Sequence, residues 1–247
     1  MRSHGTSYEN LPVVLAVTGA SGAVYAVRLL ECLLQAGRLV HCVVSPAAET
    51  VAQQELGVKG GFSVESLDGL EAACSRLLRP VSLREASGPD SERKASGRVL
   101  ADGVARGQLI IHHHGDYFVP IASGSYRTAG MIICPCSGST LAAIAHSAGQ
   151  NLVHRAAEVH LKERRKLVVV PRETPLSTFQ IENMLRLSQA GVVVLPASPG
   201  WYHGVECLGD LVDFIVARIL DQFGIELHLI QRWGTEPCEV SSTSDGK

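Results

Sequence analysis

The chain has no apolar run that approaches the roughly 18 residues needed to cross a bilayer. Its first ten residues are polar and have no apolar stretch typical of a signal peptide. The formal net charge is only −2, so the sequence gives no electrostatic reason to expect binding to nucleic acid or to an anionic membrane. We therefore expect a cytoplasmic protein with neither nucleic acid nor a membrane as its partner.

Cysteine and histidine also lack the spacing of a metal site or a disulfide framework. The seven cysteines are odd in number and lie mostly in apolar stretches, as is typical of reduced thiols in cytosolic proteins. Cys134-Pro135-Cys136 is not a C-x-x-C pair, and no second cluster completes a zinc site. The consecutive histidines 112–114 would point in different directions at a strand end, which favours a surface tract. We expect no metal.

What the chain does contain is a regular alternation of apolar runs and helical patterns. The predicted strands are 13–17, 39–44, 109–111, 131–134, 167–170 and 192–195, and the predicted helices are 23–35, 46–56, 66–78, 140–148, 151–165, 177–190 and 208–223. Such alternation predicts an α/β fold, an open parallel sheet flanked by helices on both faces. We expect a single domain over 1–247, with a polar insertion around 57–107, a mobile surface stretch at 84–97 and frayed termini.

The most informative stretch is Leu167–Pro175. Its apolar part is typical of a strand buried on both faces, and it ends at Pro171 with Arg172, Glu173 and Thr174 next. In open α/β sheets, ligands bind outside the carboxyl ends of the strands. The pattern indicates a phosphate clamp beside a proton-transfer group, although a capping loop with a solvated ion pair would look the same.

A glycine-rich turn, Thr18–Gly22, opens the first helix. Free backbone N–H groups and the positive end of the helix dipole would meet an anion there. The third glycine of a dinucleotide motif is missing, and Ser45-Pro46 stand where a ribose-binding carboxylate would follow the second strand. The turn therefore favours a mononucleotide phosphate or a flavin over NAD, with a purely geometric role for glycine as the alternative.

Hydroxyl groups follow two further strands. Ser45 precedes a proline at the first position of a helix, and Ser137-Gly138-Ser139-Thr140 opens another helix. Helix capping explains one hydroxyl in each place. Three hydroxyls and a glycine in the second loop exceed what a cap needs, so this loop is a candidate phosphate site.

Cations are the remaining candidates. Arg155 and Lys162 are seven residues apart on one predicted helix face, with Glu158 between them, and a solvated face is the simpler interpretation. Arg218 belongs to a strongly apolar helix, so its guanidinium should have an anionic partner.

Taken together, five motifs resemble the UbiX flavin prenyltransferases. They are, in chain order, Thr18-Gly19-Ala20-Ser21-Gly22-Ala23, Pro135-Cys136-Ser137, Leu161-Lys162-Glu163-Arg164-Arg165, Pro171-Arg172-Glu173-Thr174-Pro175 and Pro199-Gly200-Trp201-Tyr202-His203. The resemblance covers Pro12 to about Gly234, except the segment between Gly57 and Gly107. It implies a flavodoxin-like or Rossmann-like homo-oligomer, commonly a dodecamer. Its members join the dimethylallyl group of dimethylallyl monophosphate to N5 and C6 of reduced FMN, and the prenylated FMN serves a UbiD-type decarboxylase.

The resemblance also implies roles for particular residues. FMN would be held by Gly19, Ala20, Ser21, Ser45, Ser137, Gly138, Ser139, Thr140 and Arg172. Dimethylallyl phosphate would be surrounded by Arg155, Lys162, Arg172, Tyr202 and Arg218, whose positive charge would make magnesium unnecessary. Proton transfer and breakdown of the intermediate would fall to Ser21, Glu55 and Glu173.

Three other functions compete with this interpretation. A related FMN-dependent cysteine decarboxylase would need a catalytic histidine and a Pro-x-Met-Asn motif, and the proline turns here read Pro135-Cys136-Ser137 and Pro196-Ala197-Ser198. A carrier of prenylated FMN would be favoured by loss of Glu173 or Arg218, and both are present. A dehydrogenase is disfavoured by the missing glycine.

Overall fold

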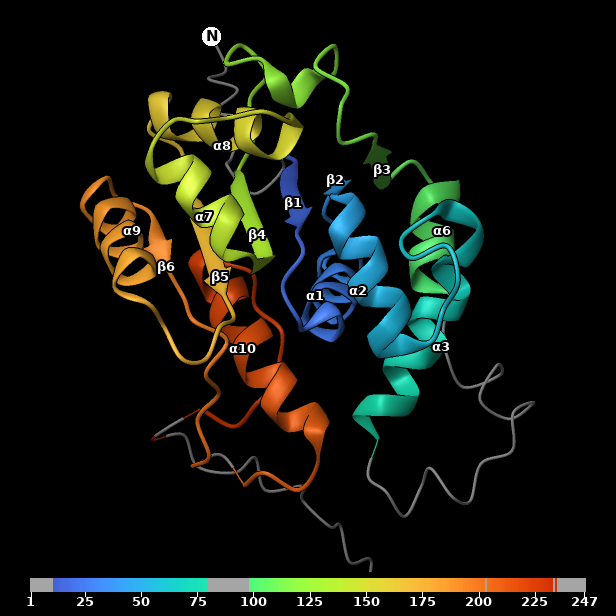
Figure 1. Cartoon of the computed structure of the whole chain (residues 1–247). Helices are drawn as coiled ribbons and strands as arrows, with labels where there is room; N and C mark the ends of the chain where they lie inside the picture. Colours follow the sequence, from blue (N-terminus) through green and yellow to red (C-terminus); the bar gives the residue numbers. More distant parts are fainter. Residues whose placement is uncertain (1–10, 80–97, 203, 233, 235–247) are drawn as a thin grey trace, which may run out of the picture.

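Within the part of the chain that the structure describes, six parallel strands form one sheet in the order β3-β2-β1-β4-β5-β6 (Figure 1). The computed structural model describes residues 11–79, 98–202, 204–232 and 234. The expected mobile stretch 84–97 and the tail from 235 lie outside the described residues. The strands are β1 (Val13–Val17), β2 (Val40–Val44), β3 (Leu109–His112), β4 (Gly130–Cys136), β5 (Leu167–Pro171) and β6 (Val193–Val194). The predicted open parallel sheet is confirmed, and its strand order reverses between β1 and β4.

The four central strands are buried over their whole length. Alternate residues of β1 enter two separate cores, because successive side chains of a strand point to opposite faces. Val13, Leu15 and Val17 pack into one core, and Val14 and Ala16 pack into the other. This burial on both faces explains why the sequence shows continuous apolar runs rather than alternation.

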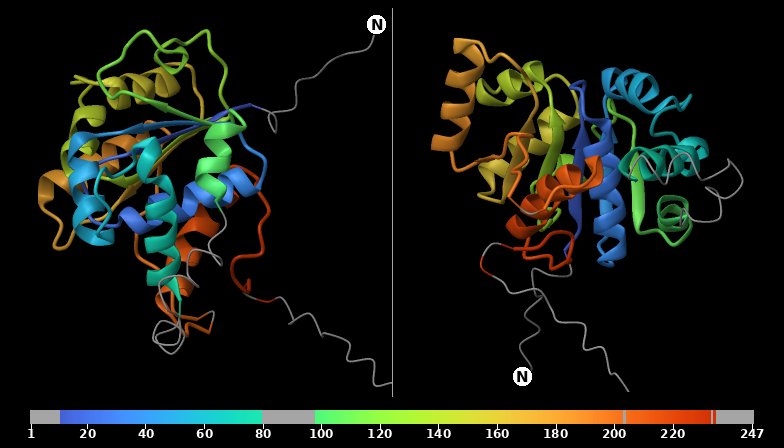
Figure 2. Two further views of the ribbon diagram at one scale, coloured as in Figure 1. Left: turned by 90° about the vertical axis from the view of Figure 1, so that its right-hand side faces the viewer. Right: turned by 90° about the horizontal axis from the view of Figure 1, so that it is seen from below.

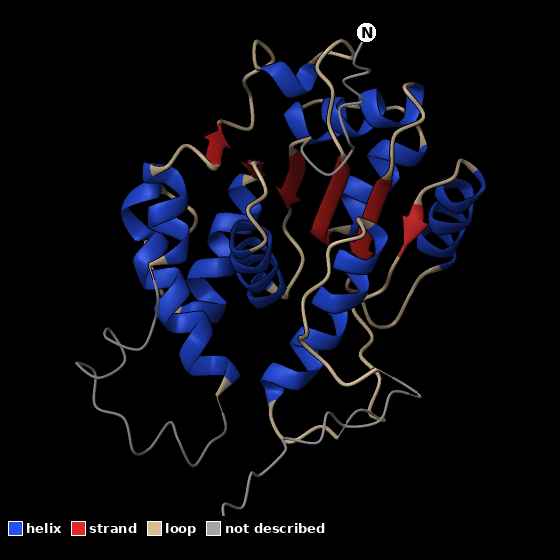
Figure 3. Cartoon of the chain, turned by 180° about the vertical axis from the view of Figure 1, so that it is seen from behind, coloured by secondary structure: helices blue, strands red, loops and turns tan. Residues whose placement is uncertain are grey.

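Helices cover both faces of the sheet, as Figures 2 and 3 show. One core receives side chains from α1 (Ala23–Gln35), α2 (Pro46–Leu56), α3 (Leu67–Leu78), α6 (Val99–Ala105) and α10 (Leu208–Gln222). The other receives them from α7 (Gly138–Ala145), α8 (Leu152–Lys162), α9 (Thr178–Gln189) and the short helix η3 (Pro120–Ala122). Within the described ranges, no helix is long and apolar enough to cross a membrane.

Local sequence signals fix several helix ends. The Ser45 hydroxyl accepts from the Ala48 N–H, Pro46 occupies the first helical position, and Gly57 ends α2 with a φ of 71°. Proline at the first position loses no helical hydrogen bond, and glycine adopts the left-handed conformation without strain. The predicted start and end of α2 are therefore confirmed.

Other boundaries differ from the sequence expectation. Helix α7 begins at Gly138, because Ser137 caps it directly, and it ends at Ala145 before Ser147 takes a φ of 51°. Helix α8 ends at Lys162, and Arg164 has a φ of 54°. Backbone reversals at non-glycine residues carry no clear sequence signal, which is why both helices end three residues earlier than the sequence predicts.

The described part of the segment 57–107 corrects the expectation of a polar insertion. Helix α3 buries Leu67, Leu70 and Cys74, and α6, which the pattern did not predict, buries Leu100. These side chains belong to the same core as α1. The Glu71 carboxylate accepts from the N–H groups of Val99 and Leu100, so an acidic residue of α3 caps α6.

An ionic cluster lies between α1 and α10. Arg28 donates two hydrogen bonds to Asp213, at 2.7 and 3.1 Å, and one to Glu31 at 3.3 Å. Glu31 is 6% exposed, and among the described residues its Oε1 has no hydrogen-bond partner. Burial, together with the nearby Glu71 carboxylate, outweighs Arg28 and raises the pKa of Glu31 to about 7.

Glu31 should make the protein less stable as the pH rises. Its pKa is higher in the folded than in the unfolded chain, so its stabilising contribution is complete below about pH 4.5 and is lost as the pH passes about 7. Between pH 5 and 8, wild type should lose on the order of 2 kcal/mol of unfolding free energy relative to Glu31→Gln. Chemical denaturation across this range checks the slope, with the exposed Glu182→Gln as the control. If the unfolding free energies of wild type and Glu31→Gln change with pH in parallel, Glu31 stays ionised in the folded protein across this range.

Candidate functional site

The polar loops predicted from the sequence meet at the carboxyl edge of the sheet. Because all strands are parallel, the turn after β1, Ser45 after β2, Ser137 after β4 and Arg172 after β5 leave the sheet at the same edge. The loop after β6 runs along this edge too, since the Ala197 N–H donates to the Pro171 carbonyl. The reversal of strand order between β1 and β4 places the turn and the Ser137 loop at the usual ligand crevice of such folds.

The glycine turn lies tightly against the start of α2. A Cβ at Gly19 would lie 2.5 Å from the Ala47 Cβ, and Gly22 has a φ of 114°. Both positions therefore require glycine, the first for a close approach and the second for its backbone conformation. The Ser45 N–H donates to the Val17 carbonyl, which holds the end of β2 beside this turn.

The Glu55 carboxylate caps α1. It accepts from the Gly22 N–H at 3.0 and 2.9 Å and from the Ala23 N–H at 2.8 Å. A carboxylate suits this position because unpaired N–H groups and the helix dipole favour negative charge there. Glu55 is thereby fixed next to Ser21, as the two predicted proton-transfer residues require.

The Ser137 loop is a compact group of hydroxyls. The Ser137 hydroxyl lies 3.0 Å from the Thr140 hydroxyl and 3.2 Å from that of Ser139, and it accepts from the Thr140 N–H. The buried Thr18 hydroxyl links this loop to the glycine turn, because it accepts from the Ser137 N–H at 2.8 Å and donates to the Pro135 carbonyl at 2.9 Å.

Arg172 and Glu173 lie over the same edge. The Arg172 Nε donates to the Ser21 carbonyl at 3.2 Å, so the cation spans from β5 to the glycine turn. The Gln180 side chain lies 3.4 Å from Glu173 Oε2, and its Nε2 would be 2.9 Å from a Cβ at Gly138. Gln180 therefore stands between Glu173 and the Ser137 loop.

Tyr202 lies farther along the loop that follows β6. Its ring packs edge to face on Phe214 of α10, with the ring centroids 5.8 Å apart, and 57% of the residue is exposed. His203, the last residue of the predicted motif, lies outside the described residues.

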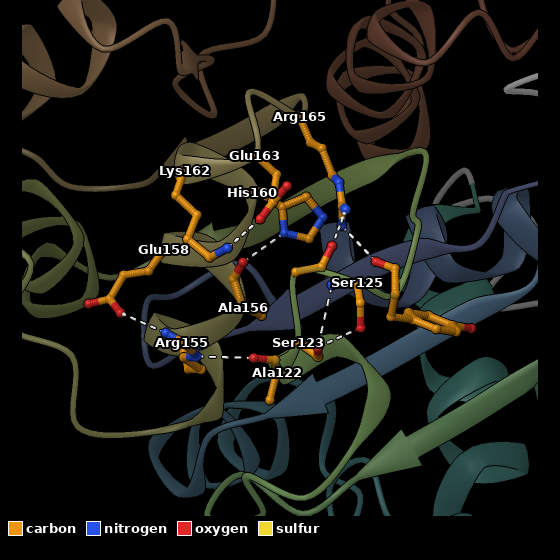
Figure 4. A network of polar contacts seen from close by, with 12 residues as sticks. Ala122, Ser123, Ser125, Arg155, Ala156, Glu158, His160, Lys162, Glu163 and Arg165 are labelled. Atoms are coloured by element: carbon orange, nitrogen blue, oxygen red, sulfur yellow. Dashed lines mark hydrogen bonds and ion pairs between the residues drawn. The ribbon is translucent and has the colours of Figure 1, made fainter.

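The remaining predicted cations are at the opposite edge. In Figure 4, Arg155 donates to the Ala122 carbonyl and pairs with Glu158, and Lys162 pairs with Glu163. The segment 122–129 leads into β4, so this face of α8 lies over the amino edge of the sheet. Arg165 fixes it there by donating to the carbonyls of Gly124 and Tyr126.

Arg218 also belongs to the amino edge. It lies one helical turn before Gln222, whose carbonyl accepts from Lys166, the residue directly before β5. Its expected anionic partner is present, since its guanidinium lies 2.8 Å from Asp221, and half of its side chain is exposed. A single chain therefore brings Ser21, Glu55, Arg172 and Glu173 together and leaves Arg155, Lys162 and Arg218 apart from them.

Cysteine and histidine side chains near the carboxyl edge are buried or paired with one another. Burial raises the pKa of the Cys136 thiol to about 12, which keeps it protonated. His112, expected in a surface tract, is instead half buried and lies 2.7 Å from the Nδ1 of His41, whose pKa burial lowers to about 4. Across the described ranges, no group of three or more His, Cys, Asp or Glu is placed to hold a metal ion.

The donor set at the carboxyl edge fits a phosphate monoester. Hydroxyls of Ser45 and of the Ser137 loop, with the Arg172 guanidinium, are the groups that recognise phosphate oxygens. Thr18 and Gln180 also belong to this arrangement, and the sequence motifs predict no role for either residue. A hydroxyl directly after a strand and the capping box formed by Ser177 and Gln180 were the available signals.

Known proteins share both the sequence and the fold. The family model described as Flavoprotein matches residues 1–220. The flavin prenyltransferase UbiX of Pseudomonas aeruginosa is 43% identical over 224 residues, which cover 91% of this chain and 94% of that relative. AnUbiX, solved in complex with FMN and dimethylallyl pyrophosphate, is 32% identical with a TM-score of 0.69, covering 92% of this chain and 100% of its own. A dodecameric FMN-dependent UbiX-like decarboxylase from Escherichia coli O157:H7 is 36% identical with the same TM-score and the same coverage.

The close approach of Gly19 and Ala47 should appear as a coupling free energy in a double-mutant cycle. Gly19→Ala forces two methyl groups together and should lower the free energy of unfolding by about 1–3 kcal/mol. Ala47→Gly removes the opposing methyl group and should cost about 0.5–1 kcal/mol alone. The double variant should be about 1 kcal/mol more stable than the sum of the single changes predicts. Additive single changes in chemical denaturation would refute the close approach.

Proposed function

The chain belongs to the UbiX family of flavin prenyltransferases, and we propose that its carboxyl-edge loops form the site of that reaction. It is an enzyme that joins a dimethylallyl group to N5 and C6 of reduced FMN and so makes prenylated FMN. The observation that carries the assignment of the site is the meeting of Ser21, Glu55, Arg172 and Glu173 at the point where the strand order reverses.

In this proposal the FMN phosphate lies between the glycine turn and the Ser137 loop. Gly19, Ala20 and Ser21 would approach it with the backbone, and Ser45 and Ser137 to Thr140 with hydroxyl and N–H groups. The Arg172 guanidinium, anchored on the Ser21 carbonyl, would supply the positive charge. Bound FMN supplies the nucleophilic N5 and C6 of its reduced ring system and a π face beside the allyl group.

The donor is proposed to be dimethylallyl monophosphate. Breaking its allylic C–O bond releases a phosphate anion and leaves a carbocation, so fixed cations must stabilise the departing charge. Arg155, Lys162 and Arg218, with Tyr202, are assigned to this phosphate. Because the three cations lie at the amino edge of their own chain, we assign them to the site of a neighbouring copy.

Exposed apolar side chains support such an assembly. On α9, Phe179, Ile181 and Leu185 are 76%, 52% and 57% exposed, and Trp201 beside Tyr202 is 71% exposed. Contiguous exposed apolar groups mark protein interfaces. We therefore propose a homo-oligomer, with a dodecamer as its size.

Closing the fourth ring requires loss of a proton from C6, and three residues are proposed to move protons. Glu173 follows Arg172 directly after β5, and its Oε2 lies 3.4 Å from the Gln180 Nε2. Glu55 is fixed by two N–H groups of α1 beside Ser21. A carboxylate and a hydroxyl in such an arrangement can relay a proton.

Two further expectations belong to this proposal. The product would be delivered to a UbiD-type decarboxylase, because prenylated FMN acts as a cofactor elsewhere. The six cysteines within the described residues are all free thiols, which supports a cytoplasmic enzyme.

A cysteine decarboxylase remains the alternative that the fold alone would allow. It would need an imidazole beside the flavin, and the described loops at the carboxyl edge that bear the proposed site contain Ser, Thr, Arg and Glu instead. Anaerobic incubation with reduced FMN and dimethylallyl monophosphate, followed by mass spectrometry of the flavin, decides between the two. A flavin heavier by one dimethylallyl group is expected, and an unchanged flavin would contradict the proposal.

Glu173→Gln should bind both substrates and fail to close the ring. Glutamine keeps the shape and hydrogen-bonding reach of the side chain and removes its basicity, so ring closure should slow by about 10²- to 10⁴-fold. Single-turnover spectra should then show accumulation of an N5-linked adduct. The exposed Glu65→Gln is the matched control and should react as wild type does. If Glu173→Gln closes the ring at a rate within a few-fold of wild type, Glu173 has a structural role and takes no part in proton transfer.

Mixed oligomers test whether neighbouring copies share a site. Arg172→Ala and Arg218→Ala should each be nearly inactive, because one weakens FMN binding and the other donor binding. Co-expressed in equal amounts, they should regain about a quarter of wild-type activity, since that share of sites receives both intact residues. Mixing Arg172→Ala with Glu173→Gln should restore nothing, because both changes affect the same edge of a chain. A failure of the first mixture, with folded subunits, would place Arg218 in its own chain's site.

A further inference from the structure

Thr18 has a buried hydroxyl that joins the ends of two strands. It is 2% exposed and follows β1 directly. Its hydroxyl donates to the Pro135 carbonyl at 2.9 Å and accepts from the Ser137 N–H at 2.8 Å. Its own N–H donates to the same Pro135 carbonyl at 3.2 Å. One side chain thus makes two hydrogen bonds across the reversal point of the sheet.

Beyond the ladder, the backbone link at this point is the bond from the Thr18 N–H to the Pro135 carbonyl, and the hydroxyl adds the connection to Ser137. Regular pairing of β1 with β4 ends at Ala16 and Ile133, and β4 has an irregular register toward β5 between Ile133 and Cys136. Pro135 has no N–H to donate to β1. The Thr18 hydroxyl continues the link beyond the ladder: it donates its proton to the Pro135 carbonyl and accepts the Ser137 N–H with a lone pair.

This link joins the two loops between which FMN phosphate is proposed to bind. Gly19 to Ser21 follow Thr18 in the chain, and Ser137 is the cap of α7 and the first residue of the hydroxyl loop. Any change in the Thr18–Ser137 contact therefore changes the separation of the two sets of phosphate-binding groups. Because the proposed phosphate-binding groups come from both loops, we expect phosphate recognition to be more sensitive to that separation than contacts to the flavin ring.

We propose that Thr18 is a positioning residue that sets the spacing of the phosphate-binding loops and thereby the preference for FMN over riboflavin. The inference rests on the proposed function of these loops. It assigns Thr18 no contact with the flavin; the hydroxyl acts through Ser137 and the glycine turn.

Flavin binding to three variants tests the role. Thr18→Val keeps the shape of the side chain and leaves the Ser137 N–H without its acceptor, and Thr18→Ser restores the hydroxyl. Thr128→Val is the matched control, because Thr128 is 4% exposed and its hydroxyl makes one hydrogen bond, 2.8 Å from His160, near the amino edge. The readout is the ratio of the dissociation constants for riboflavin and FMN, from flavin fluorescence, with unfolding midpoints measured alongside.

Thr18→Val should lower this ratio by about tenfold, because a buried donor is left unpaired or must move to find a new partner. Thr18→Ser should keep the ratio near that of wild type. Thr128→Val should also keep the wild-type ratio, even if the unfolding midpoint of this variant falls as far as that of Thr18→Val. If Thr18→Val does not fold, Thr18→Ala takes its place against Thr18→Ser.

Two results would overturn the inference: an unchanged ratio in the variant without the hydroxyl, or an equal loss in Thr128→Val. A different result would count against the proposed function itself. If wild type binds riboflavin as tightly as FMN, the loops hold no phosphate, and the Thr18 inference falls with them.

Discussion

The parallel hydrogen-bonded ladder of the sheet is the constraint from which the arrangement of this protein follows. Parallel pairing sends every strand out of the sheet at the same edge, so loops from distant parts of the sequence become neighbours. The reversal of strand order between β1 and β4 separates the helices that follow them, and the Thr18 hydroxyl joins the two strand ends at that point. Arg172 then ties β5 to the glycine turn. Each group of the proposed flavin site is thus fixed by a strand end.

The same constraint explains why one chain keeps Arg155, Lys162 and Arg218 apart from Arg172. A helix that returns the chain to the start of the next strand ends near the amino edge, as α8 does with Lys162 before β5. Helix α10 brings Arg218 toward that edge as well. Prenyl transfer needs positive charge at the leaving phosphate, next to the flavin. In the proposed assembly, neighbouring copies would supply this charge, and the exposed apolar residues of α9 offer surface for such a contact.

Much of this could be read from the sequence, and the limits have physical causes. Apolar runs such as Leu167–Val170 revealed the buried strands, and Ser45-Pro46 marked the start of a helix, because burial and capping are local requirements. Helix α6 was missed because its burial depends on α1 and α3, which only the folded chain brings near. The separation of Arg218 from Arg172 could not be predicted for the same reason. The spacing of residues along a helix does not show which edge of the sheet the end of that helix approaches. The role of Thr18 needed the position of Pro135, 117 residues away.

An experimental structure of the assembled protein with FMN and dimethylallyl monophosphate is the most direct test of the proposed shared site. The FMN phosphate should lie between the glycine turn and the Ser137 loop of one chain, near Arg172 of that chain. The prenyl phosphate should lie within ion-pair distance of Lys162 and Arg218 contributed by neighbouring copies. A prenyl phosphate bound by cations of a single chain, or a flavin away from the carboxyl edge of the sheet, would contradict it.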